Sequence, residues 1–144
     1  MIDDLDPFNT QEIVALTLIG ESESLGQQGM IETACTLMNR KKANLKWMGG
    51  DDYRTICLQK GQYNCWDEGK DRERIISIGL NNPVYTPYVI ALGIAENLLN
   101  DELIDCTHGA VSYCDGDAQV LVHPGSQPCY VNGSRRFYDL KSVA

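Results

Sequence analysis

Apolar side chains recur at helical spacing in three segments of the chain, and each segment predicts a helix with one buried face. The first runs from a cap at Asn9 or Thr10 to about residue 21, with Glu12 in the first turn, where the helix dipole favours an acidic side chain. The apolar face of this helix is formed by Ile13, Val14, Thr17 and Leu18.

The second predicted helix begins near Gln27 and fades near Ala43. It follows a loop that contains Gly26 and Gly29, which are typical residues of a break between two helices. Its buried stripe is formed by Met30, Ile31, Ala34, Leu37 and Met38.

The third predicted helix begins at Thr86 and Pro87, because Thr is a good cap and Pro suits the first helical position. Its apolar face is formed by Ile90, Ile94, Ala95, Leu98 and Leu99. A shorter helix is expected before it, over residues 71–79.

Helical periodicity is missing from residues 44–69 and from the chain beyond residue 105. The first region predicts loops, and its aromatic side chains Tyr53, Tyr63 and Trp66 either form a binding surface or cover the edge of the core. The second contains GAVSY, QVLVH and RRFYDL between turns, which predicts loops and a small hairpin. The fold class that follows is mainly α (α+β), with a small β element near the C-terminus.

Composition and charge narrow the range of functions. The 144 residues, 43% hydrophobic and 22% charged, predict one globular domain over residues 1–144. The net charge of −8 repels nucleic acid and anionic lipid, so neither is an expected partner. No stretch reaches the roughly 18 apolar residues of a membrane span, and the acidic start MIDDLDPFNT lacks the apolar core of a signal peptide.

The six cysteines lie at positions Cys35, Cys57, Cys65, Cys106, Cys114 and Cys129. Their even number is compatible with a disulfide framework, and Cys57 with Cys65 and Cys114 with Cys129 are the expected pairs. No CxxC pair or zinc-module spacing is present, so we expect no metal and no cofactor. Cys35 lies within a helical pattern and is expected to be a small core residue.

Several catalytic designs are absent from the sequence. It has no phosphate loop of the GxxxxGK[ST] type, no GxGxxG, no GxSxG elbow and no HExxH. The two histidines, His108 and His123, stand in turns, and no feature marks one of the cysteines as a nucleophile. Carboxylates and aromatic side chains remain as candidate functional groups.

Glu21 is a candidate catalytic residue because it falls at the end of the first predicted helix. The unpaired carbonyls of a helix C-terminus disfavour a carboxylate anion, and apolar neighbours such as Leu18 or Leu25 add desolvation in the same direction. A glutamic acid that stays protonated near neutral pH is the proton donor that cleavage of a glycosidic bond requires. A solvated surface residue is the alternative for any Glu at a helix end.

Four segments, in order, resemble one known family. IGESESLGQQGMIETACTLMNR (19–40) is similar to the opening YGEARGE…GM…VLNR motif of the SleB-type cell-wall hydrolases, which include spore cortex-lytic enzymes and bacteriophage lysins. TICLQKGQYNCW (55–66), THGAVSY (107–113) and RRFYDL (135–140) resemble the family segments TI…PGQFSCW, T-x-GA-x-x-(F/Y) and H-x-FY. The resemblance covers about residues 12–140.

The resemblance implies a lysozyme-like helical domain, related to lytic transglycosylases, that cleaves the bond between N-acetylmuramic acid and N-acetylglucosamine in peptidoglycan. The family's catalytic glutamate falls on Glu21. Its Asn-Arg pair falls on Asn39 and Arg40, which are interpreted as scaffold. Four positions fall on family residues that either line the cleft or serve packing: Gln62, Tyr63, Tyr113 and Tyr138.

Ser22 follows the candidate acid, as serine does in other lytic transglycosylase families. It is predicted to hydrogen-bond the acid or a substrate acetamide, and ordinary turn chemistry is the alternative. The expected partner is the glycan strand of the bacterial wall. We expect a monomeric lysin, made in the host cytoplasm without a signal peptide, that acts on the periplasmic wall.

This sequence departs from the family at three positions, where Glu23 replaces an Arg, Leu25 replaces a Glu and Arg135 replaces a His. The usual hydrolase needs two carboxylates, whereas a lytic transglycosylase needs one, so the lost acid favours transglycosylation over hydrolysis. The remaining candidates for a second acid are Glu23, Asp51, Asp52 and Asp67. Two alternatives stay open: a non-catalytic wall-binding or virion structural protein on the same fold, and a disulfide-stapled secreted protein without activity.

Overall fold

The computed structural model describes residues 4–115 and 122–143 of the chain. Its helices are α1 (Thr10–Ser22), α2 (Gly26–Ala43), α3 (Tyr53–Leu58), α4 (Lys70–Asn81) and α5 (Thr86–Leu99). Short 3-10 turns lie at η1 (Glu23–Leu25), η2 (Lys46–Met48) and η3 (Asn64–Trp66), and the strands are β1 (Ala110–Asp115), β2 (Tyr130–Asn132) and β3 (Arg135–Asp139).

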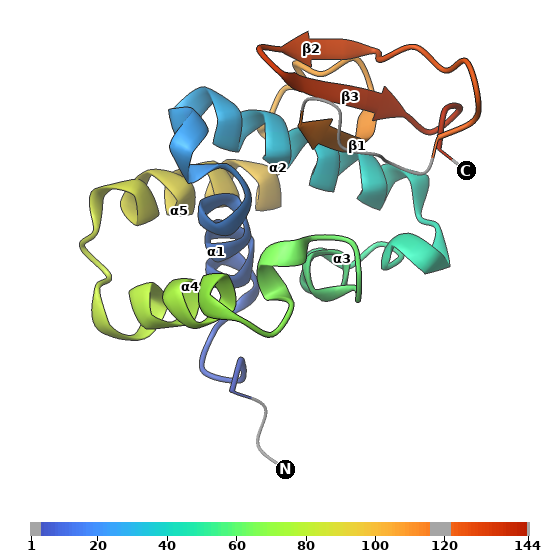
Figure 1. The fold of residues 1–144 in the computed structure, drawn as a ribbon. Coiled ribbons are helices and arrows are strands. Elements are labelled where there is room, and N and C mark those ends of the chain that lie inside the picture. The colour runs from blue at the N-terminus through green and yellow to red at the C-terminus, as the bar shows by residue number, and fades with distance from the viewer. Residues whose placement is uncertain (1–3, 116–121, 144) are drawn as a thin grey trace.

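Helix α1 is the centre of the fold. The sequence predicts one apolar face for it, but every residue from Ile13 to Ile19 is buried, because other helices surround it. Figure 1 shows α1 with α2, α3, α4 and α5 arranged around it. The predicted cap is confirmed: the Asn9 side chain accepts a hydrogen bond from the Glu12 backbone N–H, and the Glu12 carboxylate accepts one from the Asn9 N–H.

Helices α2 and α5 pack against α1 and against each other, close to the predicted boundaries. Asn44 ends α2 in a left-handed conformation, with φ 50°. The predicted apolar stripe of α2 is buried, apart from a half-buried Ile31. In α5 the prediction was wrong for Leu99, which is 37% exposed, while Tyr88 and Ala91 are buried.

The segment 44–69, predicted to be irregular, contains helix α3. Asp52 caps this helix by accepting hydrogen bonds from the Thr55 backbone N–H (3.0 Å) and hydroxyl (2.7 Å). The helix is only six residues long, too short for a periodic pattern to emerge from the sequence. Tyr53 and Tyr63 are buried in the core, so for these two residues the packing alternative applies.

The three strands form an antiparallel sheet in the order β1-β3-β2, which lies beside α2 in Figure 1. The predicted fold class, mainly α with a small β element near the C-terminus, is thereby confirmed. The predicted segment QVLVH falls partly outside the described residues, and its Val122 forms an isolated bridge with Val143. None of the described helices is both long and apolar enough to cross a bilayer.

The expected disulfides are not formed, and all six cysteines are free thiols. Cys57 is buried in α3, whereas Cys65 packs in η3 against Gly20 of α1. The sulfur of Cys129 lies 3.3 Å from the Thr107 carbonyl oxygen. Strand β3 lies between β1, which carries Cys114, and β2, which Cys129 precedes, so the predicted hairpin pair is not formed. The two sulfur atoms that come close, at 3.9 Å, belong to Cys35 and Cys106.

Burial predicts which thiols resist alkylation. Desolvation raises the pKa of both Cys35 and Cys57 to about 12. At pH 8 the fraction of each thiol that is present as the reactive thiolate is therefore about a thousandfold lower than for an ordinary cysteine. We expect a short iodoacetamide pulse on the folded protein to label the half-buried Cys106 and to spare these two. Peptide mass spectrometry measures the labelling, with urea-unfolded protein as the control in which all six react. Equal labelling of Cys57 and Cys106 in the folded protein would contradict this expectation.

Candidate active site

Glu21 lies in the last turn of α1 and is half-buried. Its Oε1 accepts a 2.5 Å hydrogen bond from the hydroxyl of Tyr113 on β1. Its Oε2 accepts a 3.2 Å hydrogen bond from the backbone N–H of Cys65 in η3. The carboxyl is thus held from both sides by elements that are distant in sequence, and it has one defined orientation.

The partners of Glu21 allow it to carry or to release a proton. Among the described residues, no ion pair involves this carboxyl. The Tyr113 hydroxyl can donate to a carboxylate or accept from a carboxylic acid, so the contact survives in both states. A direct Lys or Arg partner would instead favour the anion alone. The geometry is therefore compatible with proton donation followed by proton acceptance.

Tyr113 stays a neutral phenol under ordinary conditions. Burial raises the pKa of Tyr113 well above its usual value, and the nearby carboxylate of Glu21 raises it further. Its ring packs on Phe137, with 5.6 Å between ring centroids. Tyr113 is therefore fixed in place as a hydrogen-bond partner of Glu21.

Arg135 joins the end of α1 to the sheet. Its guanidinium lies over the ring of Tyr113, 4.2 Å from the centroid, and donates to the backbone carbonyl of Glu21 at 3.1 Å. It also donates to the Ser22 hydroxyl at 2.9 Å and pairs with Asp115 at 2.8 Å. Burial acts to lower the pKa of Arg135, but the hydrogen bond to Asp115 and the electrostatic interactions with Tyr113, Asp115 and Glu21 together outweigh it and the pKa is raised, so the side chain remains cationic.

Ser22 does not reach the Glu21 carboxyl. It is 1% exposed, and its hydroxyl shares a 2.5 Å hydrogen bond with Thr33 in addition to the bond from Arg135. At 1% exposure, the Ser22 side chain has almost no surface to offer a substrate acetamide. Its observed contacts join α1 to α2 and to β3.

Gln62 and Tyr63 are held by a buried arginine of α2. Arg40 donates to the Gln62 Oε1 at 2.8 Å and to the Val111 carbonyl at 2.6 Å, and it lies over the ring of Tyr63. Tyr63 is 3% exposed, and its hydroxyl bonds to that of Thr36. Gln62 is half-buried and keeps partial access to solvent.

Neither Asn39 nor Tyr138 is among the described hydrogen-bond partners of the Glu21 carboxyl. The Asn39 amide donates to Asp105 and to the Ala110 carbonyl, which fixes the start of β1 against α2. Burial acts to raise the pKa of Asp105, but hydrogen bonds from Thr107 and other donors outweigh it and the pKa is lowered. Tyr138 lies on β3 opposite Ser112 and is 7% exposed.

The candidate second acids differ in whether other groups of the protein engage their carboxylates. Glu23 forms an ion pair with Arg74 at 2.5 Å and accepts a hydrogen bond from Tyr85, so it faces α4 and α5. Asp52 caps α3. Asp51 and Asp67 are exposed on loops. Neither Glu23 nor Asp52 is available as a free partner of Glu21.

One buried acid was missed by the sequence interpretation. Glu32 on α2 is fully buried, and it accepts hydrogen bonds from the Tyr130 hydroxyl at 2.5 Å and the Asn132 amide at 3.0 Å. These contacts attach β2 to α2, and the hydrogen bond to Glu32 raises the pKa of Tyr130 to about 12. The available signal was the position of Glu32 between the apolar residues Ile31 and Ala34 of the predicted stripe.

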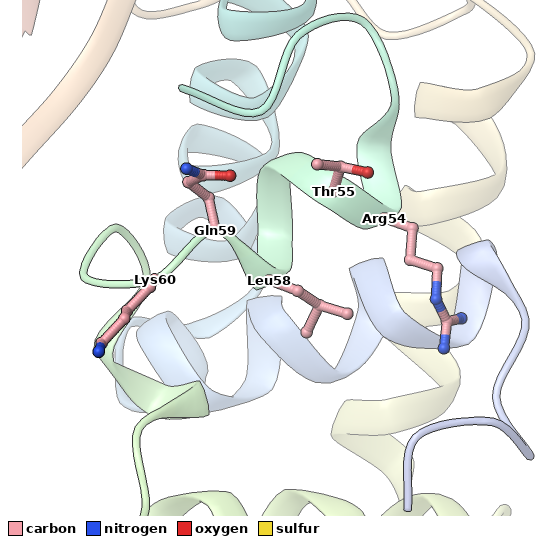
Figure 2. A pocket seen from close by; sticks show the side chains of 5 residues that line it. All are labelled: Arg54, Thr55, Leu58, Gln59 and Lys60. Atoms are coloured by element: carbon pink, nitrogen blue, oxygen red, sulfur yellow. The ribbon is translucent and has the colours of Figure 1, made fainter. Parts of the chain in front are cut away.

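An open pocket of about 420 Å³ lies elsewhere on the protein, on α3 and the segment that follows it. Figure 2 shows the side chains that line it: Arg54, Thr55, Leu58, Gln59 and Lys60. Arg54 is engaged, because its guanidinium donates to the backbone carbonyls of Phe8 and Leu5. The residues that line this pocket do not include Glu21 or its partners Tyr113 and Cys65.

No His, Cys, Asp and Glu side chains of the described ranges form a group of three that could hold a metal ion. Comparisons of the chain with protein-family models, with curated proteins and with solved structures find no match. The resemblance to the SleB-type hydrolases and the lysozyme-like character of the fold therefore stay predictions that rest on the four sequence segments and the site geometry.

Proposed function

We propose that this protein cleaves the glycan strands of peptidoglycan between N-acetylmuramic acid and N-acetylglucosamine, with Glu21 as the proton donor. The observation that carries the proposal is the state of the Glu21 carboxyl: half-buried at a helix end, unpaired by any cation of the described chain, and oriented by Tyr113 and the Cys65 N–H. The motif that bears the catalytic glutamate in the resembling family supplies the substrate class.

The proposed reaction begins when the Glu21 carboxyl donates its proton to the glycosidic oxygen. The bond from the muramic anomeric carbon to that oxygen then breaks, and the sugar gains oxocarbenium character. The carboxylate left on Glu21 next accepts the proton of the muramic C6 hydroxyl, whose oxygen attacks the anomeric carbon. The products are a free N-acetylglucosamine hydroxyl and a 1,6-anhydro-muramic end, and Glu21 is again protonated.

We favour this transglycosylase route over hydrolysis for a reason of geometry. The usual hydrolase route uses a second carboxylate beside the first. Glu23 is held by Arg74 and Tyr85, and Asp52 by the N-terminus of α3. The other two candidates, Asp51 and Asp67, are exposed on loops and are not among the described hydrogen-bond partners of Glu21. In the transglycosylase route, Glu21 first donates and then accepts a proton, so no second carboxylate is needed. The Tyr113 hydroxyl can hydrogen-bond both the carboxylic acid and the carboxylate form of Glu21.

The products of digestion test this proposal. We expect the protein to lower the turbidity of purified cell walls and to release muropeptides that end in anhydro-muramic acid, lighter by one water than the reducing form. Mass spectrometry of the soluble fraction separates the two forms. Reducing ends alone would show a muramidase, and wall binding without any cleaved glycan would contradict the proposed activity.

A further inference from the structure

Arg135 is buried and donates more hydrogen bonds than a surface ion pair would. It is 5% exposed, and its guanidinium donates to groups from three elements. Its partners are the Glu21 carbonyl and Ser22 hydroxyl on α1, the Thr33 hydroxyl on α2 and the Asp115 carboxylate on β1. Only Asp115, whose side chain is 61% exposed, can relax into solvent. The position of the cation is therefore fixed by the core.

The cation faces a group that contacts the candidate acid. The guanidinium carbon lies 4.2 Å from the centroid of the Tyr113 ring, and the hydroxyl of that ring is 2.5 Å from the Glu21 Oε1. A cation on the face of a phenol withdraws electron density and makes its hydroxyl a stronger donor. A stronger donor stabilises the carboxylate more than the carboxylic acid.

We infer that Arg135 is a positioning residue that acts through Tyr113 to stabilise the carboxylate form of Glu21. The inference deepens the proposed function and rests on it for its catalytic meaning. The carboxylate is the state that follows proton donation, so Arg135 would assist the step in which the glycosidic bond breaks. Arg135 itself touches no reacting atom in this scheme.

Other groups also contribute to the electrostatic environment of Glu21. The Cys65 thiol of η3 and the Cys57 thiol of α3 lie close enough to be affected by its charge, and burial raises the pKa of both, so they remain neutral. Burial likewise raises the pKa of Tyr63. Two buried cations lie in this region: Arg40 stands over the ring of Tyr63 and donates to the Val111 carbonyl, whereas Arg135 stands over the ring of Tyr113, whose hydroxyl contacts Glu21.

The experiment follows the Glu21 carboxyl directly, without the need for turnover. In protein labelled with carbon-13 at the glutamate carboxyl, Glu21→Gln identifies the resonance, and its shift is recorded against pH. We expect the titration midpoint in Arg135→Gln to lie about one pH unit above that of the wild type. The alkaline limb of the wall-lysis profile should move in the same direction. Arg136→Gln is the matched control, because Arg136 is the exposed neighbour on β3, and its midpoint should coincide with the wild type.

Two further variants test whether the effect of Arg135 passes through the Tyr113 phenol, and they keep the inference testable if Arg135→Gln fails to fold. In a Tyr113→Phe background, Arg135→Gln should move the midpoint by less than half as much as it does with the phenol present. Asp115→Asn removes an exposed charge, should fold, and should lower the midpoint, because the guanidinium then lacks its counter-charge. Equal shifts in the two backgrounds would overturn the route through Tyr113.

The outcomes separate this inference from the proposed function. A raised midpoint in Arg135→Gln together with a wild type that cleaves no glycan supports the electrostatic link and contradicts the enzyme activity. Active wild type with unchanged midpoints in both Arg135→Gln and Asp115→Asn overturns the inference and leaves the activity standing.

Discussion

Glu21→Gln is expected to lower the rate of wall lysis by about 10²- to 10⁴-fold, the usual contribution of a positioned general acid. The amide keeps the shape of the side chain, and its oxygen can still accept one hydrogen bond, from Tyr113 or from the Cys65 N–H. It has no acidic proton to give to a leaving oxygen. Initial rates of turbidity loss on purified walls measure the effect, and circular dichroism shows whether the fold is kept.

The matched control for this variant is Glu23→Gln, two positions along the chain. Glu23 pairs with Arg74, whose side chain is 50% exposed, so losing the ion pair should cost at most about 1 kcal/mol of stability. Lysis by Glu23→Gln should stay within a few-fold of the wild type, since its carboxylate faces α4 and α5. If Glu21→Gln lyses walls as fast as the wild type, the assignment of Glu21 as the acid is wrong.

Gly20→Ala is expected to destabilise the protein by about 1–3 kcal/mol, although alanine is normally favoured over glycine in a helix. A Cβ on Gly20 would stand 2.5 Å from the Cβ and 2.7 Å from the Sγ of Cys65. Either α1 or η3 must then move, and η3 carries the N–H that holds the Glu21 carboxyl. We therefore expect slower lysis as well as a lower midpoint in urea unfolding.

Gly93→Ala is the control for this second prediction. Gly93 lies in α5 and is exposed, and apart from its chain neighbours and the backbone of its own helix, no atom of the described residues lies within 4 Å of the position that a Cβ would occupy. The same change should here stabilise the protein by about 0.5–1 kcal/mol and leave lysis unaltered. Two Gly→Ala variants with stability changes of the same sign would contradict the tight contact between Gly20 and Cys65.

The helices that the sequence predicted well are those whose determinants are local. Asn9 and Glu12 are three residues apart and satisfy each other's backbone N–H groups wherever the helix is placed. Pro87 in the first turn of α5 acts through its own fixed φ, although the predicted cap was wrong: Tyr85 occupies the cap position without a side-chain hydrogen bond, and Thr86 is the first helical residue. Helix α3 was missed because six residues show no period, and only its cap at Asp52 marks it.

For the cysteines, separation along the chain does not predict which sulfur atoms lie close together, because packing places the side chains. Cys57 and Cys65 are eight positions apart, yet burial in different elements keeps them as separate thiols. Cys35 and Cys106 are 71 positions apart, and the docking of the segment before β1 on α2 brings their sulfur atoms to 3.9 Å. Such proximity follows from how elements dock, and no spacing in the sequence encodes it.

Periodicity and caps act within a few residues, so they were enough to predict the helical class, the main helix boundaries and the place of Glu21 in the last turn of its helix. The partners of that carboxyl instead depend on how distant elements pack. Tyr113 is 92 positions away and Arg135 is 114, and both reach the end of α1 because the sheet docks on α2. Hydrogen bonds between elements depend on the packing of the whole chain, which a pattern of neighbouring residues does not specify.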